Sequence, residues 1–140
     1  MNKSQPSATL RDWIFGARPR TLPLAVSPVI LGSASAVLRD QFDVVLAVFA
    51  GIVAVSLQVG VNYANDYSDG IRGTDDHRVG PQRLTGSGLA SPQAVKRAAL
   101  AGFGVSVLAG ASLVASSQTW ELLIVGATAL IAAWTYTGGR

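Results

Sequence analysis

A fifteen-residue stretch, NYANDYSDGIRGTDD at 62–76, gathers side chains that are well suited to hold a cation. Its two asparagines and four aspartates offer the hard oxygen donors that Mg²⁺ prefers, usually one or two carboxylates with water and substrate phosphates completing the shell. If the stretch is helical, Asn62, Asn65 or Asp66, and Asp69 share one face. The predicted ligands of Mg²⁺ are Asn65, Asp66 and Asp69.

Two further acids follow this helical stretch. Gly70 and Gly73 are expected to break the helix, after which Asp75 and Asp76 can fold back toward the same point. An EF-hand is excluded because the alternating acids and the terminal glutamate are missing. An alternative is a solvated acidic loop paired with nearby arginines, which would contribute little energy. The position favours a site, since the first polar residues of the stretch still belong to an apolar span.

The elements that must position these residues are apolar helices. The chain is 49% hydrophobic and only 14% charged, whereas about a quarter of the residues in soluble domains are charged. Four stretches without Lys, Arg, Asp or Glu approach the roughly 20 residues that cross a bilayer, and they lack the polar face of a soluble core helix. The predicted fold class is all-α, a polytopic membrane helical bundle with four transmembrane helices. Their expected ranges are 21–38, 44–69, 92–116 and 120–138, with a loop at 70–91 and an N-terminal segment at 1–20 that carries an interfacial helix.

The third span carries two local signals. Ser91 precedes Pro92, an arrangement typical of a helix N-cap followed by a first-turn proline. Small residues then recur along the span and are expected to let a neighbouring helix approach closely. These small residues are Gly102, Gly104, Ala109 and Gly110.

The basic residues are distributed asymmetrically between the two sides of these spans. Ten of the eleven flank one side, and only Arg39 lies on the other. The positive-inside rule makes the richer side cytoplasmic, together with both termini and the aspartate-rich loop. We therefore expect a multi-pass protein of the cell (plasma) membrane that contacts the lipid bilayer and no nucleic acid. Cysteine is absent, which excludes disulfides and thiolate metal sites.

Three segments resemble a known family. NDYSD at 65–69 followed by GTDD at 73–76 resembles the first aspartate-rich motif, N-D-x-x-D-x-x-x-D, of the UbiA superfamily of intramembrane prenyltransferases. The segments 17–32 and 80–92 resemble the branch that prenylates 1,4-dihydroxy-2-naphthoate to give demethylmenaquinone. The resemblance covers essentially the whole chain. It departs from the general motif at Gly73, which occupies the place of the third aspartate.

The resemblance implies a nine-helix bundle in which a second aspartate-rich motif faces the first. This chain is then expected to be the N-terminal part, with the C-terminal half missing and no activity alone. The implied reaction is Mg²⁺-dependent transfer from polyprenyl diphosphate to 1,4-dihydroxy-2-naphthoate. Guanidinium groups suit both the diphosphate and the naphthoate carboxylate. The catalytic candidates are Asp66, Asp69, Asp75 and Asp76, and the substrate-binding candidates are Asn62, Arg72, Arg78, Arg83, Arg18 and Arg20; for the last two, anchoring at the membrane surface is an equal explanation.

Other functions remain open at this point. The acceptor can be another aromatic ring. A metal-ion transporter can use Asp and Asn without prenyl chemistry, and a small scaffold subunit can dock a partner through the acidic loop. The enzyme is favoured because the acids lie at a helix end beside basic residues suited to an anion, whereas transport sites lie deeper, at interrupted helices.

Overall fold

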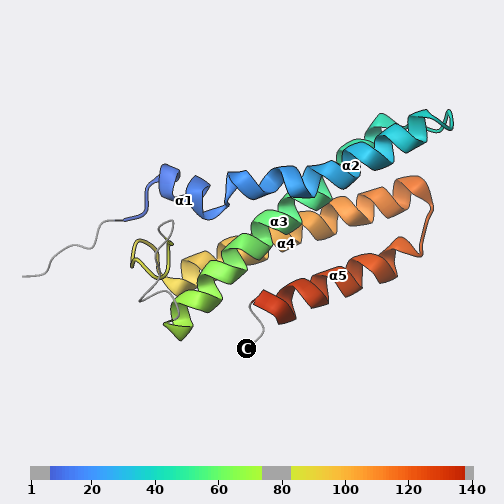
Figure 1. Ribbon diagram of the computed structural model, residues 1–140. Helices are drawn as coiled ribbons and strands as arrows, with labels where there is room; N and C mark the ends of the chain where they lie inside the picture. Colours follow the sequence, from blue (N-terminus) through green and yellow to red (C-terminus); the bar gives the residue numbers. More distant parts are fainter. Residues whose placement is uncertain (1–6, 74–82, 138–140) are drawn as a thin grey trace, which may run out of the picture.

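A computed structural model of the chain describes residues 7–73 and 83–137. A short helix and a 3₁₀ turn lead into two antiparallel pairs of longer helices (Figure 1). The elements are α1 (Leu10–Gly16), η1 (Pro19–Thr21), α2 (Leu22–Val37), α3 (Val44–Arg72), α4 (Pro92–Ser117) and α5 (Leu122–Thr137).

The all-α membrane bundle is confirmed. Within the described ranges every regular element is a helix. Three segments are long and apolar enough to cross a membrane, namely Leu10–Val37, Val44–Arg72 and Pro92–Ser117. The fourth expected span is shorter: α5 has 16 residues, fewer than the roughly 20 that cross the hydrocarbon upright.

The ends of the two longest helices are set by local sequence. The Asp43 carboxylate accepts from the amides of Val45 and Leu46, at 2.7 and 3.2 Å, and so caps the start of α3. Gly73 ends that helix in the left-handed region, at φ 67°. Ser91 caps α4 as predicted, its hydroxyl accepting from the Ala94 amide at 3.3 Å. The predicted N-cap is therefore confirmed.

α3 runs three residues past the expected end at 69 and stops at Arg72. Gly70 was expected to break the helix and instead lies inside it. The reason is a tertiary contact: a Cβ at Gly70 would stand 2.5 Å from the Thr85 Cβ. The glycine therefore makes room for segment 83–90 rather than ending the helix.

α3 and α4 make the main helix pair. A Cβ on Gly102 would lie 2.9 Å from the Gly60 Cα, and a Cβ on Gly60 would meet the Phe103 ring at 2.9 Å. Small residues thus allow close backbone approach, as predicted for Gly102. Gly104 was expected to serve the same purpose, but its Cβ would meet nothing within 4 Å. Only one face of α4 packs on α3, and Gly104 lies off that face.

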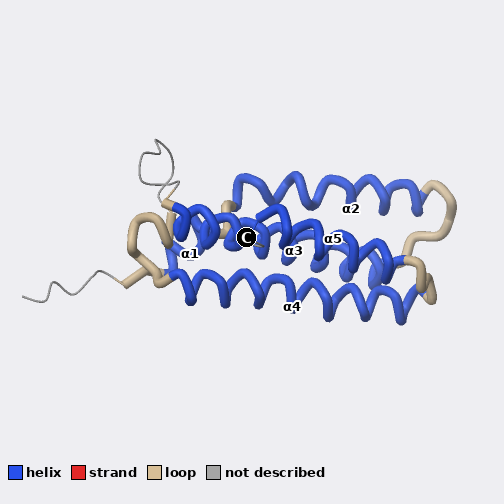
Figure 2. Tube along the Cα trace, turned by 90° about the horizontal axis from the view of Figure 1, so that it is seen from below, coloured by secondary structure: helices blue, strands red, loops and turns tan. Residues whose placement is uncertain are grey.

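α2 and α4 lie on opposite sides of α3 (Figure 2), and α5 returns antiparallel to α4 (Figure 1). The Trp134 ring of α5 meets Phe103 of α4 edge-on, with centroids 6.3 Å apart. Both outer helices expose apolar side chains, among them Leu31 on α2 and Ile124 on α5. Such surfaces suit lipid or further membrane helices.

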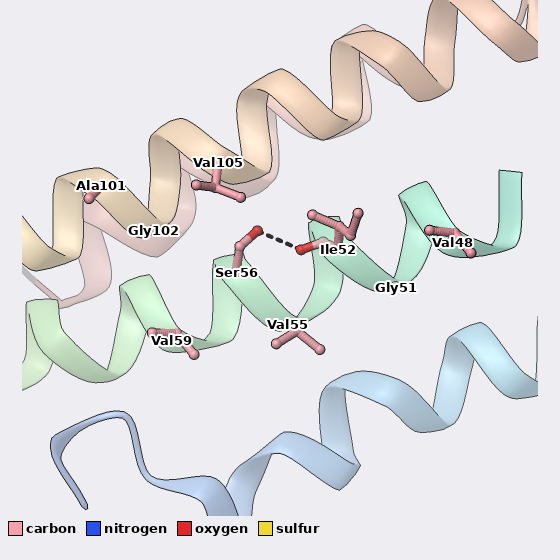
Figure 3. Close-up of a pocket in the computed structure, with 9 residues that line it drawn as sticks. All are labelled: Val48, Gly51, Ile52, Val55, Ser56, Val59, Ala101, Gly102 and Val105. Atoms are coloured by element: carbon pink, nitrogen blue, oxygen red, sulfur yellow. Dashed lines mark hydrogen bonds between the residues drawn. The ribbon is translucent and has the colours of Figure 1, made fainter. Parts of the chain in front are cut away.

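A groove of about 730 Å³ runs between α3 and α4 (Figure 3). Its lining is almost wholly aliphatic, and the Ser56 hydroxyl donates to the Ile52 carbonyl of its own helix at 2.6 Å. The polar end of α3, from Asn62 onward, lies beyond the groove. The residues drawn in Figure 3 are Val48, Gly51, Ile52, Val55, Ser56, Val59, Ala101, Gly102 and Val105.

Candidate functional site

The candidate residues gather at one end of the bundle. α1, the last turns of α3 and the first turn of α4 meet there, at the left in Figure 1. Segment 83–90 lies against them through the buried Leu84, whose Cδ1 would stand 2.8 Å from a Cβ on Gly16. The segment is closed by its own hydrogen bond, from the Ala90 amide to the Leu84 carbonyl at 3.0 Å. It therefore forms a defined turn beside the end of α3.

The polar residues of α3 form two rows rather than the single predicted face. Gln58, Asn62 and Asp66 follow one another four residues apart, and the last two are buried. The Gln58 amide donates to the Asn62 Oδ1 at 3.4 Å. Asn65 and Asp69, also four apart, are only partly buried. The inner row therefore faces the protein, whereas the outer row is partly exposed.

Asn62 joins α3 to the N-terminal segment. Its Nδ2 donates to the Ala17 carbonyl at 2.8 Å and to the Thr21 Oγ1 at 3.0 Å. One residue on, the Tyr63 hydroxyl donates to the Trp13 carbonyl at 2.7 Å. Asn62 was predicted to bind substrate, and the structure engages its amide within the protein.

Asp66 joins α3 to segment 83–90. Its Oδ2 accepts from the Leu84 amide and its Oδ1 from the Thr85 amide, both at 2.9 Å. The residue is 2% exposed. Two hydrogen bonds from backbone donors compensate the burial of the charge. Both carboxylate oxygens are thus directed at main chain.

Asp69 and Arg83 form an ion pair at the outer row. The Arg83 Nη1 lies 2.9 Å from the Asp69 Oδ2, with side chains 10% and 31% exposed. An arginine this well covered is held in place by its surroundings, while the carboxylate keeps access to solvent. The structure therefore brings together one predicted acid and one predicted anion-binding residue.

The remaining predicted residues lie at the end of α3, in or beside η1, or outside the described residues. Arg72 is exposed at the last residue of α3. Arg18 is half-buried in the left-handed region at φ 53°, and Arg20 is exposed in η1. Both lie between Ala17 and Thr21, the two residues whose oxygens accept from the Asn62 amide. Asp75, Asp76 and Arg78 lie outside the described residues.

The fit of Mg²⁺ is tested against the oxygen donors of the two rows. Within residues 7–73 and 83–137 no three acidic, histidine or cysteine side chains cluster as a metal site. Asp66 faces backbone amides through both oxygens. The other two predicted ligands, Asn65 and Asp69, lie in the outer row, where Asp69 is also paired with Arg83. Two protein oxygens, with water and phosphate supplying the rest, match the way proteins usually hold Mg²⁺.

Sequence reasoning missed Lys96. Its Nζ lies 5.5 Å from the Tyr67 ring centroid and 5.9 Å from that of Trp134. Three helices meet at this ammonium, because the rings belong to α3 and α5 and the lysine to α4. The available signal was a charged residue inside a predicted span, which must find a partner.

The match to known proteins is specific. The model of the UbiA prenyltransferase family matches residues 25–140. The chain belongs to this family. The resemblance seen in the aspartate-rich motif is thereby confirmed. No solved structure matches the chain.

Three curated relatives of this UbiA family member carry one name, 1,4-dihydroxy-2-naphthoate octaprenyltransferase. The protein of Mycobacterium leprae is 55% identical over 94% of this chain and 44% of its own length. That of Mycobacterium tuberculosis is 52% identical over 94% of this chain and 45% of its own length. The Escherichia coli relative is 39% identical over 100% of this chain and 47% of its own length. The chain thus spans less than half the length of these relatives.

Proposed function

We propose that the outer row of α3 and Arg83 bind the diphosphate of a polyprenyl diphosphate, in an enzyme that transfers the polyprenyl group to 1,4-dihydroxy-2-naphthoate. The ion pair between Asp69 and Arg83 at the end of an apolar helix carries this proposal. The names of the relatives support it, since all three describe this transfer.

The reaction begins with breakage of the allylic C–O bond, whose electron pair leaves with the diphosphate. The ring carbon that bears the carboxylate then attacks the allylic cation and a C–C bond forms. The carboxylate departs as CO₂, and its electron pair restores the aromatic ring. The products are diphosphate, CO₂ and the prenylated dihydroxynaphthalene, whose oxidised form is demethylmenaquinone.

The residues at the site match the charge that develops in this reaction. The Arg83 guanidinium can donate two parallel hydrogen bonds to phosphate oxygens as they gain charge. Asn65 and Asp69 would hold Mg²⁺, with Asp75 or Asp76 as further candidates. When bound, the ion neutralises the leaving diphosphate. Arg72, exposed at the last residue of α3, would attract the anion toward the site.

The same end of the bundle is proposed to face the cytoplasm, in the cell membrane. The helices and connecting segments at this end carry Arg11, Arg18, Arg72, Arg83 and Lys96. Arg39 lies in the turn between α2 and α3 at the other end (Figure 1). Excess Lys and Arg mark the cytoplasmic side of membrane proteins.

A chimera tests the proposal. This chain replaces the aligned segment of the Mycobacterium tuberculosis relative, and membranes are assayed for prenylated naphthoquinone with Mg²⁺. We expect product from the chimera and a loss of at least about 100-fold in Asp69→Asn, since a ligand of the charged leaving group is removed. Asp43→Asn, which keeps a capping side chain at the opposite end of α3, is the matched control. Unchanged turnover in Asp69→Asn would contradict the proposal.

A further inference from the structure

Asp66 is a buried carboxylate whose two partners come from a distant segment. The amides of Leu84 and Thr85 lie 18 and 19 residues along the chain, and each donates to a different oxygen at 2.9 Å. An ionised carboxylate this deeply buried requires such donors, because an unpaired charge would be very costly.

Segment 83–90 is held in one position by several contacts around this carboxylate. Thr85 packs on Gly70 of α3, and Leu84 fills the space beside Gly16 of α1. The turn itself is closed by the Ser87 amide donating to the Arg83 carbonyl at 3.1 Å. The main chain of this segment therefore has little freedom to shift along α3.

Arg83, the residue just before these two amides, is a contact partner of Asp69. Arg83 reaches Asp69, which lies three residues beyond Asp66 on α3 and so about one helical turn away. Asp66 thus fixes the main chain at 84–85, and the side chain of the preceding arginine extends to the next turn of the same helix. The two contacts form one bridge between the turn and α3.

We propose that Asp66 is a positioning residue, which holds segment 83–90 so that the Arg83 guanidinium is set beside Asp69. This role rests on the proposed function, in which Arg83 and Asp69 bind the diphosphate. The burial of Asp66 opposes a role as cation ligand, since Mg²⁺ keeps several water or phosphate oxygens and needs room for them. A carboxylate that is 2% exposed and bonded through both oxygens lacks that room.

The first experiment needs neither substrate nor metal. Amide hydrogen exchange is measured on the whole chain in lipid nanodiscs. Asp66→Asn replaces one acceptor oxygen by an NH₂ group that cannot accept. We expect exchange at Leu84 and Thr85 to become at least about tenfold faster, with the α4 amides unchanged. Asp69→Asn should leave both amides protected, and equal exchange in Asp66→Asn and the parent chain would overturn the proposal.

The position of Arg83 is followed in the same samples. Its Nε–H resonance should shift in Asp66→Asn, because the guanidinium loses its fixed place beside Asp69. Asp66→Glu serves as a second variant, since it keeps the charge and displaces the carboxylate by one methylene. We expect the same shift and the same faster exchange. An Arg83 signal that neither variant moves would show that Asp66 does not place this side chain.

The second experiment measures binding of farnesyl diphosphate with Mg²⁺ to the chimera, in which the relative supplies the rest of the enzyme. If Asp66 acts through Arg83, the double variant Asp66→Asn/Arg83→Gln binds no more weakly than Arg83→Gln alone. Asp66→Asn should leave the Mg²⁺ concentration for half-saturation unchanged, whereas Asp69→Asn should raise it. A rise in Asp66→Asn equal to that in Asp69→Asn would make Asp66 a ligand and overturn the proposal.

The two experiments separate the two proposals. A chimera that binds no farnesyl diphosphate counts against the proposed function, while exchange and the Arg83 signal still decide the role of Asp66. Normal binding with unaltered exchange in Asp66→Asn rejects the positioning role and leaves the proposed function standing.

Discussion

Gly102 of α4 lies directly against Gly60 of α3, so that a Cβ on Gly102 would stand 2.9 Å from the Gly60 Cα and 3.0 Å from the Ser56 carbonyl oxygen. The atoms nearest this Cβ all belong to the backbone of α3, so there is no flexible side chain that could move aside for it. The pairing of the two longest helices depends on this contact.

Gly102→Ala should therefore destabilise the α3–α4 pair. We expect a loss of about 1–3 kcal/mol, because an added methyl group must push two backbones apart. Helix unfolding in detergent micelles, followed by circular dichroism, measures it. Gly104→Ala is the matched control, since its new methyl meets nothing within 4 Å. Equal losses in both variants would mean that the effect comes from helix propensity rather than from the crossing.

Ser68 offers a test of a buried hydroxyl. Its Oγ is buried and has no hydrogen-bond partner among the described residues. Ser68→Ala should leave stability unchanged or raise it by up to about 1 kcal/mol, because removing an unsatisfied polar group relieves its desolvation. Ser91→Ala should instead lower stability by about 1 kcal/mol through loss of the α4 cap. Comparable losses in the same unfolding assay would reveal a partner for Ser68.

Lys96 should contribute to the docking of α5. Lys96→Met keeps the apolar stem and removes the charge, so we expect a loss of about 0.5–2 kcal/mol from its two ring contacts. The loss should shrink in a Trp134→Leu background, which a double-mutant cycle measures. Arg97→Met, at the exposed neighbouring position, is the control. A loss that is unchanged by Trp134→Leu would assign the effect to another contact.

The proposed orientation predicts opposite labelling of the two ends. Cysteines replace Ser87, exposed in the turn before α4, and Gln41, exposed between α2 and α3. In sealed vesicles a membrane-impermeant maleimide should reach only one of the two from outside. Vesicles of inverted orientation should reverse the pattern. Labelling of both positions from one side would refute the proposed topology.

The elements of this fold were predictable because they depend on local rules. Hydrocarbon excludes charge over a fixed length, so charge-free stretches indicate spans. Ser91 before Pro92 indicates a helix start from two adjacent residues. The predicted end of α3 was three residues too early. Gly70 was expected to end the helix, but it makes room for Thr85, which is distant in sequence and close in space.

The candidate site was predictable only as a set of residue types. Spacing put Asn62, Asp66 and Asp69 near one another, but helical periodicity does not say which row faces the protein. That depends on Ala17 and Leu84, whose backbone groups bond to the inner row. Ionisable side chains look alike in sequence whether their partner is main chain or ligand. The partner becomes visible only when the turn at 83–90 is placed against α3.

The length of α3 has a consequence for depth in the membrane. At 1.5 Å per residue, the apolar part from Val44 to Val61 spans about 27 Å, close to the thickness of the hydrocarbon layer. Asp69 then lies about 12 Å beyond that layer, at the level of the lipid headgroups. A lipid substrate anchored by its tail carries its charged head at this same height. Its diphosphate would reach the carboxylate by lateral diffusion in the leaflet, without entering the hydrocarbon layer.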